Sequence, residues 1–476
     1  MKRVLVVLAS LALSPAVFAQ ARVEPAPAPL VFTHVTVIDA TGAQEKADMS
    51  VVIIGDRIVE IGPTKKLRAP KNAQVIDASG KFLIPGLWDM HVHAFDKGLF
   101  SPLFIANGIT GIRDMFSPLP AINQWRKEIK EGTLIGPHIV AAGPIVDGPK
   151  PIWPGSIAVS NPDEGIKAVN TVKQGGSDFV KVYSLLPRDA YFAIAAEAKR
   201  QGMVFAGHVP GSVTPAEASD AGQKSIEHLT GILQACSSKE DQIRKETEAA
   251  SKSGERLPVS AAIKYQLAAV DSFDGKKAGE LYARFVKNGT WMAPTLTVLR
   301  AIAYVGDSDF RSDPRLSYVP GYLKSGMWGA DPFGLKSRTA DDNAGAKRVF
   351  QKSLEIVGAM RRAGVQIIAG TDTPNPFVFP GFSLHDELGL LVKAGLTPMD
   401  ALQAATRNAA VYLGMLDTVG TVEKGKLADL VLLDADPLVD IANTKKINAV
   451  VVGGKLVNRA ALDEMLSKVE ERNKLK

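Results

Sequence analysis

The 476-residue chain has a single cysteine, Cys236, and neither a long apolar run nor a block of basic residues. One cysteine cannot form an intrachain disulfide. It also excludes a cysteine-rich zinc module, so a bound metal would need His, Asp, Glu or Lys-derived ligands. No apolar run reaches the ~20 residues that a membrane span requires. The net charge of +6 comes from scattered Lys and Arg residues, so we expect no nucleic-acid partner.

The composition is that of an ordinary globular protein. Apolar residues make up 46% of the chain and charged residues 22%. The 42 glycines follow no three-residue period, which excludes a collagen-like chain. The length suits one large α/β barrel together with a smaller unit.

The first 29 residues have the features of a secretion signal and a linker. Lys2 and Arg3 precede an apolar stretch of about ten residues, and a run of small residues ends at Ala19. This order predicts a signal peptide, residues 1–19, that is cleaved after Ala19. Residues 20–29 carry three prolines and are predicted to form an extended linker. We therefore expect a secreted or periplasmic protein with no integral membrane segment after signal removal.

Short β-type runs with turn residues between them occur near both ends of the chain. The first set lies in residues 30–84 and the second in residues 411–460. Because the two sets flank a long middle region, we predict one small sheet unit built from both chain ends. Residues 461–476 are predicted to be a helix or a tail.

The middle region, residues 85–410, alternates short apolar strands with helical stretches, which predicts a (β/α)8 TIM barrel. Two of the connections are too long for a single helix, so helical insertions are expected at 230–290 and 298–365. The eight predicted strands are Leu87–Ala94, Ile109–Met115, His138–Gly143, Phe179–Ser184, Val204–Val209, Lys224–Leu229, Trp291–Thr297 and Gln366–Asp372.

Polar side chains gather at the carboxyl ends of these predicted strands. His91 and His93 are two residues apart, so on a strand they point the same way. The other members of the group are Lys181, His208, His228 and Asp372. Carboxyl ends of barrel strands meet at one mouth, and imidazole and carboxylate ligands suit zinc, manganese or iron. A lone histidine is more often structural, and Lys181 could instead form a salt bridge with Asp178 or Asp372.

This ordered set resembles the amidohydrolase superfamily. The segments Gly381–Leu388 and Gly420–Val431 are similar to its imidazolonepropionase-like and prolidase-like branch. The resemblance covers about residues 30–460 and implies that the flanking β sets, 30–84 and 411–460, form a small composite β-sandwich domain. It implies that Lys181 is carboxylated to N6-carboxylysine and bridges two divalent metal ions, most simply Zn2+. It further implies that His91, His93 and Asp372 bind the more buried ion, and that His208 and His228 bind the other.

The resemblance also implies a mechanism and a substrate class. A metal-bridged hydroxide attacks an amide or peptide carbonyl, and Asp372 transfers the proton to the leaving nitrogen. A dipeptidase, with Xaa-Pro dipeptidases as one analogy, is the expected activity, with a small molecule or dipeptide as substrate. Tyr183 is a candidate for substrate binding, and Trp153 for lining the pocket. Arg113, Asp114, His34, His138 and His385 are expected to be structural.

Several alternatives remain open. A deaminase or an imidazolonepropionase-like cyclic amide hydrolase is disfavoured, because Gly211 stands where related deaminases carry a glutamate, three residues after His208. A lactonase or phosphotriesterase is compatible with the same ligands. A non-catalytic metal binder is the alternative from another class. A homo-oligomer is compatible with the sequence.

Overall fold

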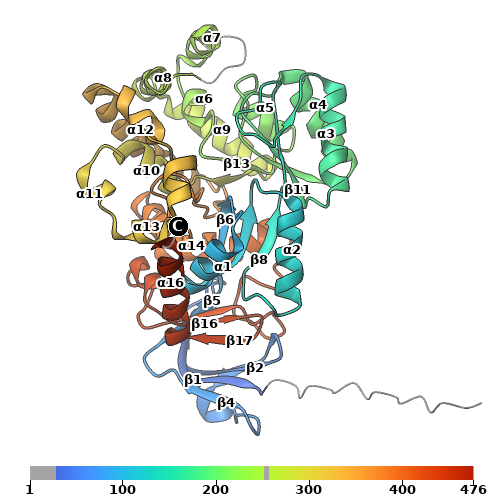
Figure 1. The fold of residues 1–476 in the computed structure, drawn as a ribbon, viewed down its shortest axis with the longest axis vertical. Coiled ribbons are helices and arrows are strands. Elements are labelled where there is room, and N and C mark those ends of the chain that lie inside the picture. The colour runs from blue at the N-terminus through green and yellow to red at the C-terminus, as the bar shows by residue number, and fades with distance from the viewer. Residues whose placement is uncertain (1–27, 251–256, 475–476) are drawn as a thin grey trace, which may run out of the picture.

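The computed structural model describes residues 28–250 and 257–474, which form an α/β fold with three sheets (Figure 1). The predicted signal peptide, 1–19, and most of the predicted linker, 20–29, lie outside the described residues. Within the described residues, no helix is both long enough and apolar enough to cross a membrane.

One eight-stranded sheet joins the two ends of the chain. Its order is β17-β16-β15-β5-β1-β2-β3, with β4 paired to β1. Figure 1 shows blue and red strands together at the bottom of the view. The strands are β1 (Leu30–Val37), β2 (Lys46–Ile54), β3 (Arg57–Pro63), β4 (Gln74–Asp77), β5 (Phe82–Pro85), β15 (Leu430–Leu433), β16 (Ile447–Val452) and β17 (Lys455–Asn458). The composite β-sandwich domain that the resemblance implies is not shown, because the described strands of both chain ends form one sheet, in which β15 pairs antiparallel with β5.

The remaining strands are parallel and lie in two further sheets. The first has the order β6-β7-β8, and the second has the order β10-β9-β11-β12-β13-β14. Seven of the eight predicted segments contain one of these strands, each shorter than predicted. The bounds are β6 (Leu87–Val92), β7 (Ile109–Asp114), β8 (His138–Ala141), β9 (Ile145–Asp147), β10 (Ile157–Ala158), β11 (Phe179–Val182), β12 (Val204–Gly207), β13 (Ser225–Glu227) and β14 (Trp291–Ala293).

The eighth predicted strand, residues 366–372, is not a regular strand, so the sheets are not closed into the predicted barrel. Isolated bridges, from Met292 to Ile367 and from Val92 to Thr373, connect this part of the chain to β14 and β6, together with scattered backbone hydrogen bonds such as that from the Asp372 N–H to the His91 carbonyl oxygen at 2.7 Å. A physical reason is that the Thr371 N–H donates to the Asp89 carboxylate, at 3.0 Å, and not to a strand carbonyl. The segment nevertheless lies beside both β6 and β14.

Helices pack around the parallel strands. α3 illustrates why they form: the Asn161 side chain caps its first turn, Pro162 starts it, and Ala168, Val169 and Val172 form its buried face. The helices of this layer are α1 (Lys97–Ala106), α2 (Leu119–Lys130), α3 (Pro162–Gln174), α4 (Arg188–Arg200), α5 (Pro215–Asp220), α13 (Phe382–Lys393), α14 (Pro398–Ala404) and α15 (Arg407–Leu413).

The two long connections are helical and occupy the upper part of Figure 1. The connection from β13 to β14 holds α6 (Ile232–Ala235), α7 (Glu240–Ala250), α8 (Val259–Asp271) and α9 (Gly275–Asn288). The connection after β14 holds α10 (Leu296–Tyr304), α11 (Ser308–Arg311), η2 (Pro314–Tyr318), η3 (Leu323–Met327), η4 (Pro332–Ser337) and α12 (Ala340–Arg362). Outside these connections lie η1 (Thr64–Lys66), η5 (Ile441–Lys445) and α16 (Arg459–Lys474).

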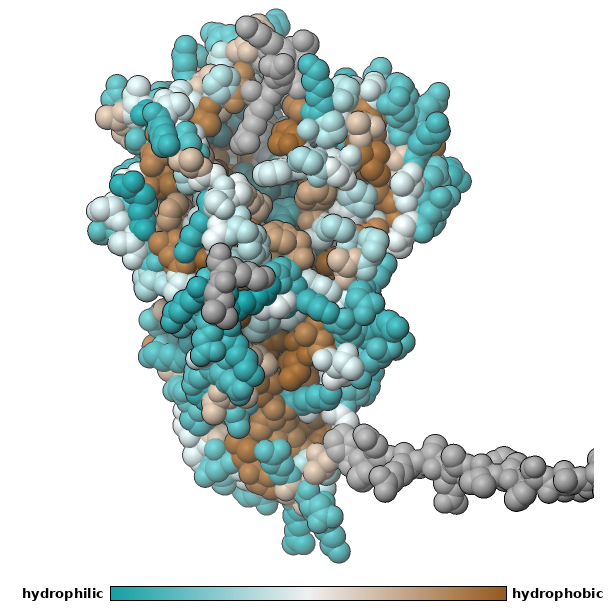
Figure 2. Space-filling model, in the orientation of Figure 1, coloured by the Kyte–Doolittle hydropathy of each residue, from teal (hydrophilic) through white to brown (hydrophobic). Residues whose placement is uncertain are grey.

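The C-terminal helix α16 packs back onto the chain near the first parallel strand. Arg472 forms two hydrogen bonds with the carboxylate of Asp96, at 3.0 and 2.7 Å. Asp96 also caps α1 and accepts a hydrogen bond from the Tyr322 hydroxyl. The outer surface is mainly hydrophilic in Figure 2, with apolar areas over the lower, eight-stranded sheet.

Candidate metal centre

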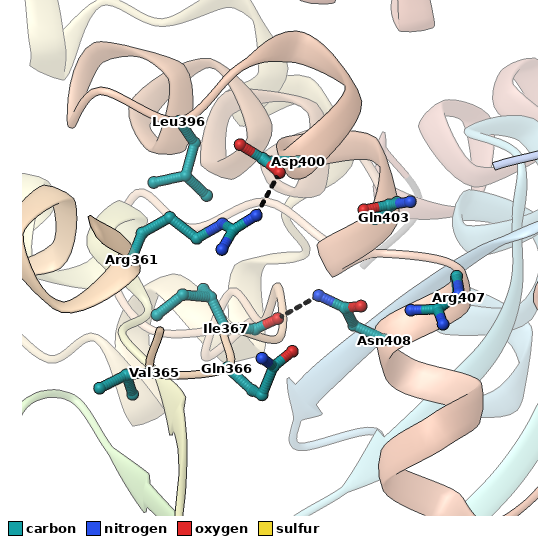
Figure 3. Close-up of a pocket in the computed structure, with 9 residues that line it drawn as sticks. All are labelled: Arg361, Val365, Gln366, Ile367, Leu396, Asp400, Gln403, Arg407 and Asn408. Carbon is teal, nitrogen blue, oxygen red and sulfur yellow. Dashed lines mark hydrogen bonds and ion pairs between the residues drawn. The ribbon is translucent and has the colours of Figure 1, made fainter. Parts of the chain in front are cut away.

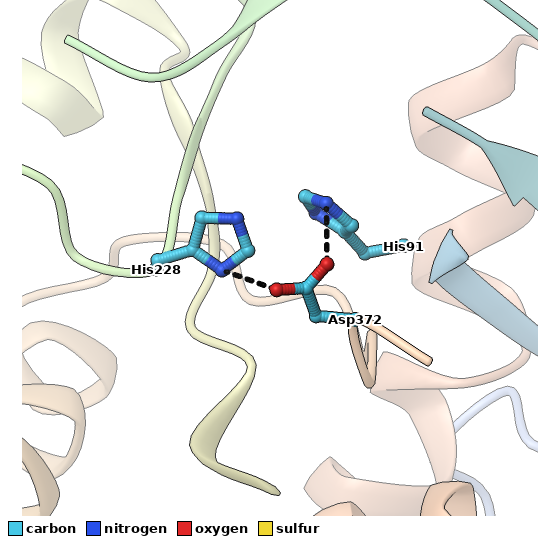
Figure 4. Close-up of side chains that lie close together, drawn as sticks. All are labelled: His91, His228 and Asp372. Atoms are coloured by element: carbon cyan, nitrogen blue, oxygen red, sulfur yellow. Dashed lines mark ion pairs between the residues drawn. The ribbon is translucent and has the colours of Figure 1, made fainter. Parts of the chain in front are cut away.

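Asp372 is the common neighbour of three histidines from distant parts of the chain. Its Oδ1 lies 3.0 Å from Nε2 of His93 and 3.4 Å from Nε2 of His91. Its Oδ2 lies 3.7 Å from Nδ1 of His228. Figure 4 shows the Asp372 carboxylate between the rings of His91 and His228. One carboxylate therefore connects the ends of β6 and β13 with the irregular eighth segment.

The other two predicted ligands border the same group. The His208 ring follows β12 and lies 4.8 Å, centroid to centroid, from the His228 ring. Lys181 is fully buried on β11, and its Nζ lies 5.7 Å from the centroid of the Tyr183 ring. Among the described residues Lys181 forms no ion pair, and Asp178 pairs instead with Arg126. The salt-bridge alternative for Lys181 is therefore not seen.

The donor atoms fit a divalent cation. His91, His228 and Asp372 each offer a ligand atom, and these atoms all lie within 4.8 Å of one another. Nε2 of His91, Nδ1 of His93 and Nζ of Lys181 are buried without a hydrogen-bond partner among the described residues. Buried polar atoms normally have a partner, so this concentration of unsatisfied nitrogens points to a ligand. Imidazole nitrogen and carboxylate oxygen are suitable donors for zinc and similar ions.

Burial adjusts the charges of these groups. Burial lowers the pKa of His228 to about 4 and that of His91 well below its usual range, so both imidazoles are neutral near pH 7. Burial alone would raise the pKa of Asp372, but His228 and a hydrogen bond from His93 give a net lowering. Burial also lowers the pKa of Lys181 to about 8. Neutral imidazoles and an ionised carboxylate are the forms that bind metals.

The backbone is strained at two of these residues, His228 and Asp372. His228 has φ of 58° and Asp372 has φ of 66°, and both residues lie in the left-handed region. Thr295, whose hydroxyl lies 2.6 Å from Nδ1 of His228, has φ of 46°. Such conformations are unfavourable for residues with a side chain and concentrate at functional sites. Their grouping here indicates that the fold holds these residues in place for a purpose other than stability.

Two glycines allow the chain to approach the site closely. A Cβ at Gly207, which has φ of +138°, would lie 2.1 Å from the carbonyl oxygen of Val182. A Cβ at Gly370 would lie 2.8 Å from Cβ of His91. Neither contact is sterically tolerable, so both positions need glycine to keep the strand ends together.

Outer partners of the histidines were missed by sequence reasoning. Nδ1 of His91 donates to Oε2 of Glu227 at 2.8 Å, and both side chains are fully buried. Nδ1 of His208 lies 2.8 Å from the Ser184 hydroxyl. The available signal for Glu227 was a carboxylate inside the buried strand β13, directly before His228. Its partner, His91, could not be found because 136 residues separate the two.

Tyr183 and Trp153 lie next to the histidine cluster. The Tyr183 ring packs on the His208 ring, with 3.9 Å between centroids and 31° between planes. The indole Nε1 of Trp153 donates to the Tyr183 hydroxyl at 2.9 Å. Tyr183 therefore lies against His208, and Trp153 is joined to His208 through Tyr183.

The remaining histidines lie outside this cluster. His138 pairs with Asp429 at 2.8 Å, and His34 pairs with Asp48 at 2.8 Å on the exposed surface. His385 is buried and contacts the Thr444 hydroxyl at 3.0 Å and the Asn107 carbonyl oxygen at 3.1 Å. Arg113 and Asp114 are buried on β7, where Asp114 accepts the N–H of Ala94 at 2.7 Å.

A cavity of about 230 Å3 lies at the opposite end of the eighth segment (Figure 3). Its lining includes the ion pair of Arg361 with Asp400, at 2.7 Å, and the side chain of Asn408, which donates to the Ile367 carbonyl oxygen. None of the six predicted ligands lines this cavity. The six predicted metal ligands therefore lie outside this cavity.

Comparisons with known proteins agree with this geometry. The sequence profile described as "Amidohydrolase family" matches residues 82–457. The ochratoxinase of Aspergillus niger is 24% identical over 490 residues, which cover 87% of this chain and 84% of that protein. A shorter match, 42% identical over 85 residues, is to the imidazolonepropionase of Pseudomonas savastanoi pv. phaseolicola, and it covers 18% of this chain and 21% of that protein.

A solved structure has a similar fold. The putative prolidase from Bifidobacterium longum superposes with a TM-score of 0.67 and 22% sequence identity, covering 94% of this chain and 100% of that one. At this level of identity the likeness concerns the fold.

Proposed function

We propose that this chain, which belongs to the amidohydrolase family and is therefore a hydrolase acting on carbon–nitrogen bonds, cleaves the peptide bond of a dipeptide. The predicted family resemblance is thereby confirmed. The observation that carries the proposal is the grouping of His91, His228 and Asp372, whose ligand atoms lie within 4.8 Å of one another, together with the buried nitrogens around them that lack a hydrogen-bond partner among the described residues.

The proposed ligand set holds two divalent ions, with Zn2+ as the first candidate. His91, His93 and Asp372 would hold one ion, and His208 and His228 would hold the other. The Lys181 amine would add to carbon dioxide, releasing one proton, and the resulting carbamate would offer an oxygen to each ion. The burial of the Lys181 amine without a hydrogen-bond partner supports this modification, because a buried ammonium would be costly.

The residues of the chain have distinct tasks in the proposed reaction. The metals, when bound, supply Lewis acidity and lower the pKa of a water. Asp372 accepts a proton on a carboxylate oxygen and donates it to the leaving nitrogen. The Tyr183 hydroxyl is held by Trp153 and is proposed to bind the substrate carboxylate or the developing oxyanion.

Specific observations bear on two alternatives, ochratoxin as the substrate and deamination as the reaction. Ochratoxin is a second candidate, because the similarity to ochratoxinase extends over 87% of this chain. Deamination is disfavoured, because Gly211 offers no carboxylate beyond His208, and its N–H donates to the carbonyl oxygen of Ser184.

We also propose that the mature protein is exported. The charged, apolar and small-residue order of residues 1–19 supports export. Sequencing the amino terminus of the protein purified from the cell exterior or periplasm should show Gln20 as the first residue.

The activity is tested directly with purified protein. The Zn2+-loaded enzyme is incubated with a library of dipeptides that includes Xaa-Pro members, and with ochratoxin, and the products are identified by mass. Free amino acids that appear with the metal and disappear on chelation support the proposal. Release of ammonia alone would show a deaminase, and no turnover of any amide would overturn the proposal.

A further inference from the structure

A buried chain of charges lies behind the candidate metal centre. Nη2 of Arg113 donates to both carboxylate oxygens of Glu227, each at 2.9 Å. The same carboxylate accepts the hydrogen bond from Nδ1 of His91 at 2.8 Å. Arg113, Glu227 and His91 are all 0% exposed, so water screens none of these contacts. The chain therefore leads from β7 through β13 to β6.

The guanidinium of Arg113 is held from several sides. Its Nε donates to the Met90 carbonyl oxygen at 2.6 Å, and its Nη1 donates to the hydroxyls of Ser225 at 3.0 Å and Tyr412 at 2.9 Å. Ser225 in turn donates to Oε1 of Glu227 at 2.5 Å. With this many bonds, neither Arg113 nor Glu227 has freedom to move. A buried ion pair is stable only when its remaining donors and acceptors are satisfied in this way.

The partner of His91 differs in kind from those of the neighbouring histidines. His208 and His228 face the hydroxyls of Ser184 and Thr295, which can donate or accept. The Glu227 carboxylate pairs with the Arg113 guanidinium and accepts from His91, which places the proton of neutral His91 on Nδ1. Nε2 of His91 is then left with its lone pair, on the side where Asp372 lies at 3.4 Å.

We propose that Glu227, held by Arg113, is a positioning residue that sets the tautomer and direction of His91 for metal binding. The inference rests on the proposed metal-dependent function and adds to it two residues outside the predicted ligand set. A carboxylate behind a histidine ligand raises the basicity of the imidazole and limits its rotation. Arg113 holds this carboxylate in place through two hydrogen bonds, so its effect on the metal passes through Glu227.

The test measures metal affinity by competition with a chelating dye, on the full mature chain without substrate. Glu227→Gln should weaken Zn2+ binding about 10- to 100-fold, the range known for partners of histidine ligands. Because Glu227→Gln leaves Arg113 buried without a counter-charge, the double variant Glu227→Gln with Arg113→Met is measured as well. This variant removes both charges and should show the same loss of affinity while remaining folded.

The chain offers a matched control. His138 and Asp429 form a histidine–carboxylate pair of the same length, 2.8 Å, outside the metal centre. Asp429→Asn should therefore leave Zn2+ affinity within about twofold of wild type, because no proposed ligand touches Asp429. Equal Zn2+ affinity of the wild type and the double variant would overturn the positioning role and leave the proposed function intact. A wild type that binds no divalent ion would overturn both.

Discussion

Nε2 of His93 lies 3.0 Å from Oδ1 of Asp372, although 279 residues separate the two in the chain. The contact exists because the end of β6 and the irregular eighth segment run side by side, with Gly370 packed against His91. Asp372 also approaches His91 and His228, so it is the residue through which the largest number of proposed ligands meet.

Replacement of Asp372 by asparagine should abolish most of the activity while preserving the fold. Asparagine has the same size but cannot accept and return a proton, so we expect kcat to fall about 10²- to 10⁴-fold. At least one metal ion per chain should remain, because His91, His93, His208 and His228 are unchanged. Steady-state kinetics measures kcat, and elemental analysis of the same preparation measures the number of metal ions per chain. A kcat within threefold of wild type would remove the proton-transfer role.

Replacement of Lys181 by alanine should lower both metal occupancy and turnover. The carbamate is the proposed bridge, so its loss should reduce the bound metal from two ions to one or fewer per chain. Lys167→Ala is the control, because that lysine is exposed on α3, outside the metal centre. If Lys181→Ala retains two ions and normal turnover, Lys181 is not the bridge. Mass spectrometry of the intact wild type in bicarbonate buffer offers a second readout.

The sequence alone predicted where the side chains of the proposed metal ligands would gather. The carboxyl ends of parallel strands meet at one edge, and the histidines stand directly at those ends, so local pattern was enough. The prediction of a regular eighth strand was wrong. The backbone N–H of Thr371 donates to the Asp89 carboxylate and not to a carbonyl oxygen of a neighbouring strand. The sandwich was expected from the family resemblance, whereas the strand runs predicted only one small sheet unit, and such runs do not reveal that β15 pairs with β5. Arg113 and Glu227 were not paired in advance, because no local rule connects positions 114 residues apart.

The free energy of unfolding should depend on pH because His385 is buried in its neutral form. Burial lowers the pKa of His385 to about 4, from its ordinary value of 6.5, so the folded state disfavours the proton. The stabilisation is complete above pH 6.5 and is lost as the pH falls towards 4, because the unfolded chain binds the proton first. A pKa difference of this size corresponds to about 3 kcal/mol of unfolding free energy.

Urea unfolding of the metal-free protein between about pH 4.5 and pH 8 measures this effect. His385→Gln keeps an amide donor for the Asn107 carbonyl oxygen but does not titrate, so its stability should fall less steeply with acid than that of wild type. His34→Gln, at an exposed histidine, is the control and should follow the wild-type curve. Parallel curves for wild type and His385→Gln would show that His385 does not contribute.

Substitution of Gly370 by alanine tests how closely the eighth segment must approach β6. The new Cβ would lie 2.8 Å from Cβ of His91 and 2.9 Å from its backbone nitrogen, so one of the two segments must move. Overpacking of this kind destabilises a core by about 1–3 kcal/mol. Because the displaced residue is a proposed ligand, Zn2+ affinity should fall as well.

Gly389→Ala is the matched control, since nothing lies within 4 Å of the Cβ that it adds within α13. Alanine favours a helix over glycine by about 0.5–1 kcal/mol, so this variant should be as stable as wild type or more stable. Its Zn2+ affinity should not change. If Gly370→Ala and Gly389→Ala unfold at the same urea concentration and bind Zn2+ equally, the close contact with His91 does not hold the metal centre together. If only Gly370→Ala loses both properties, the packing of these two segments and the metal site form one structural unit.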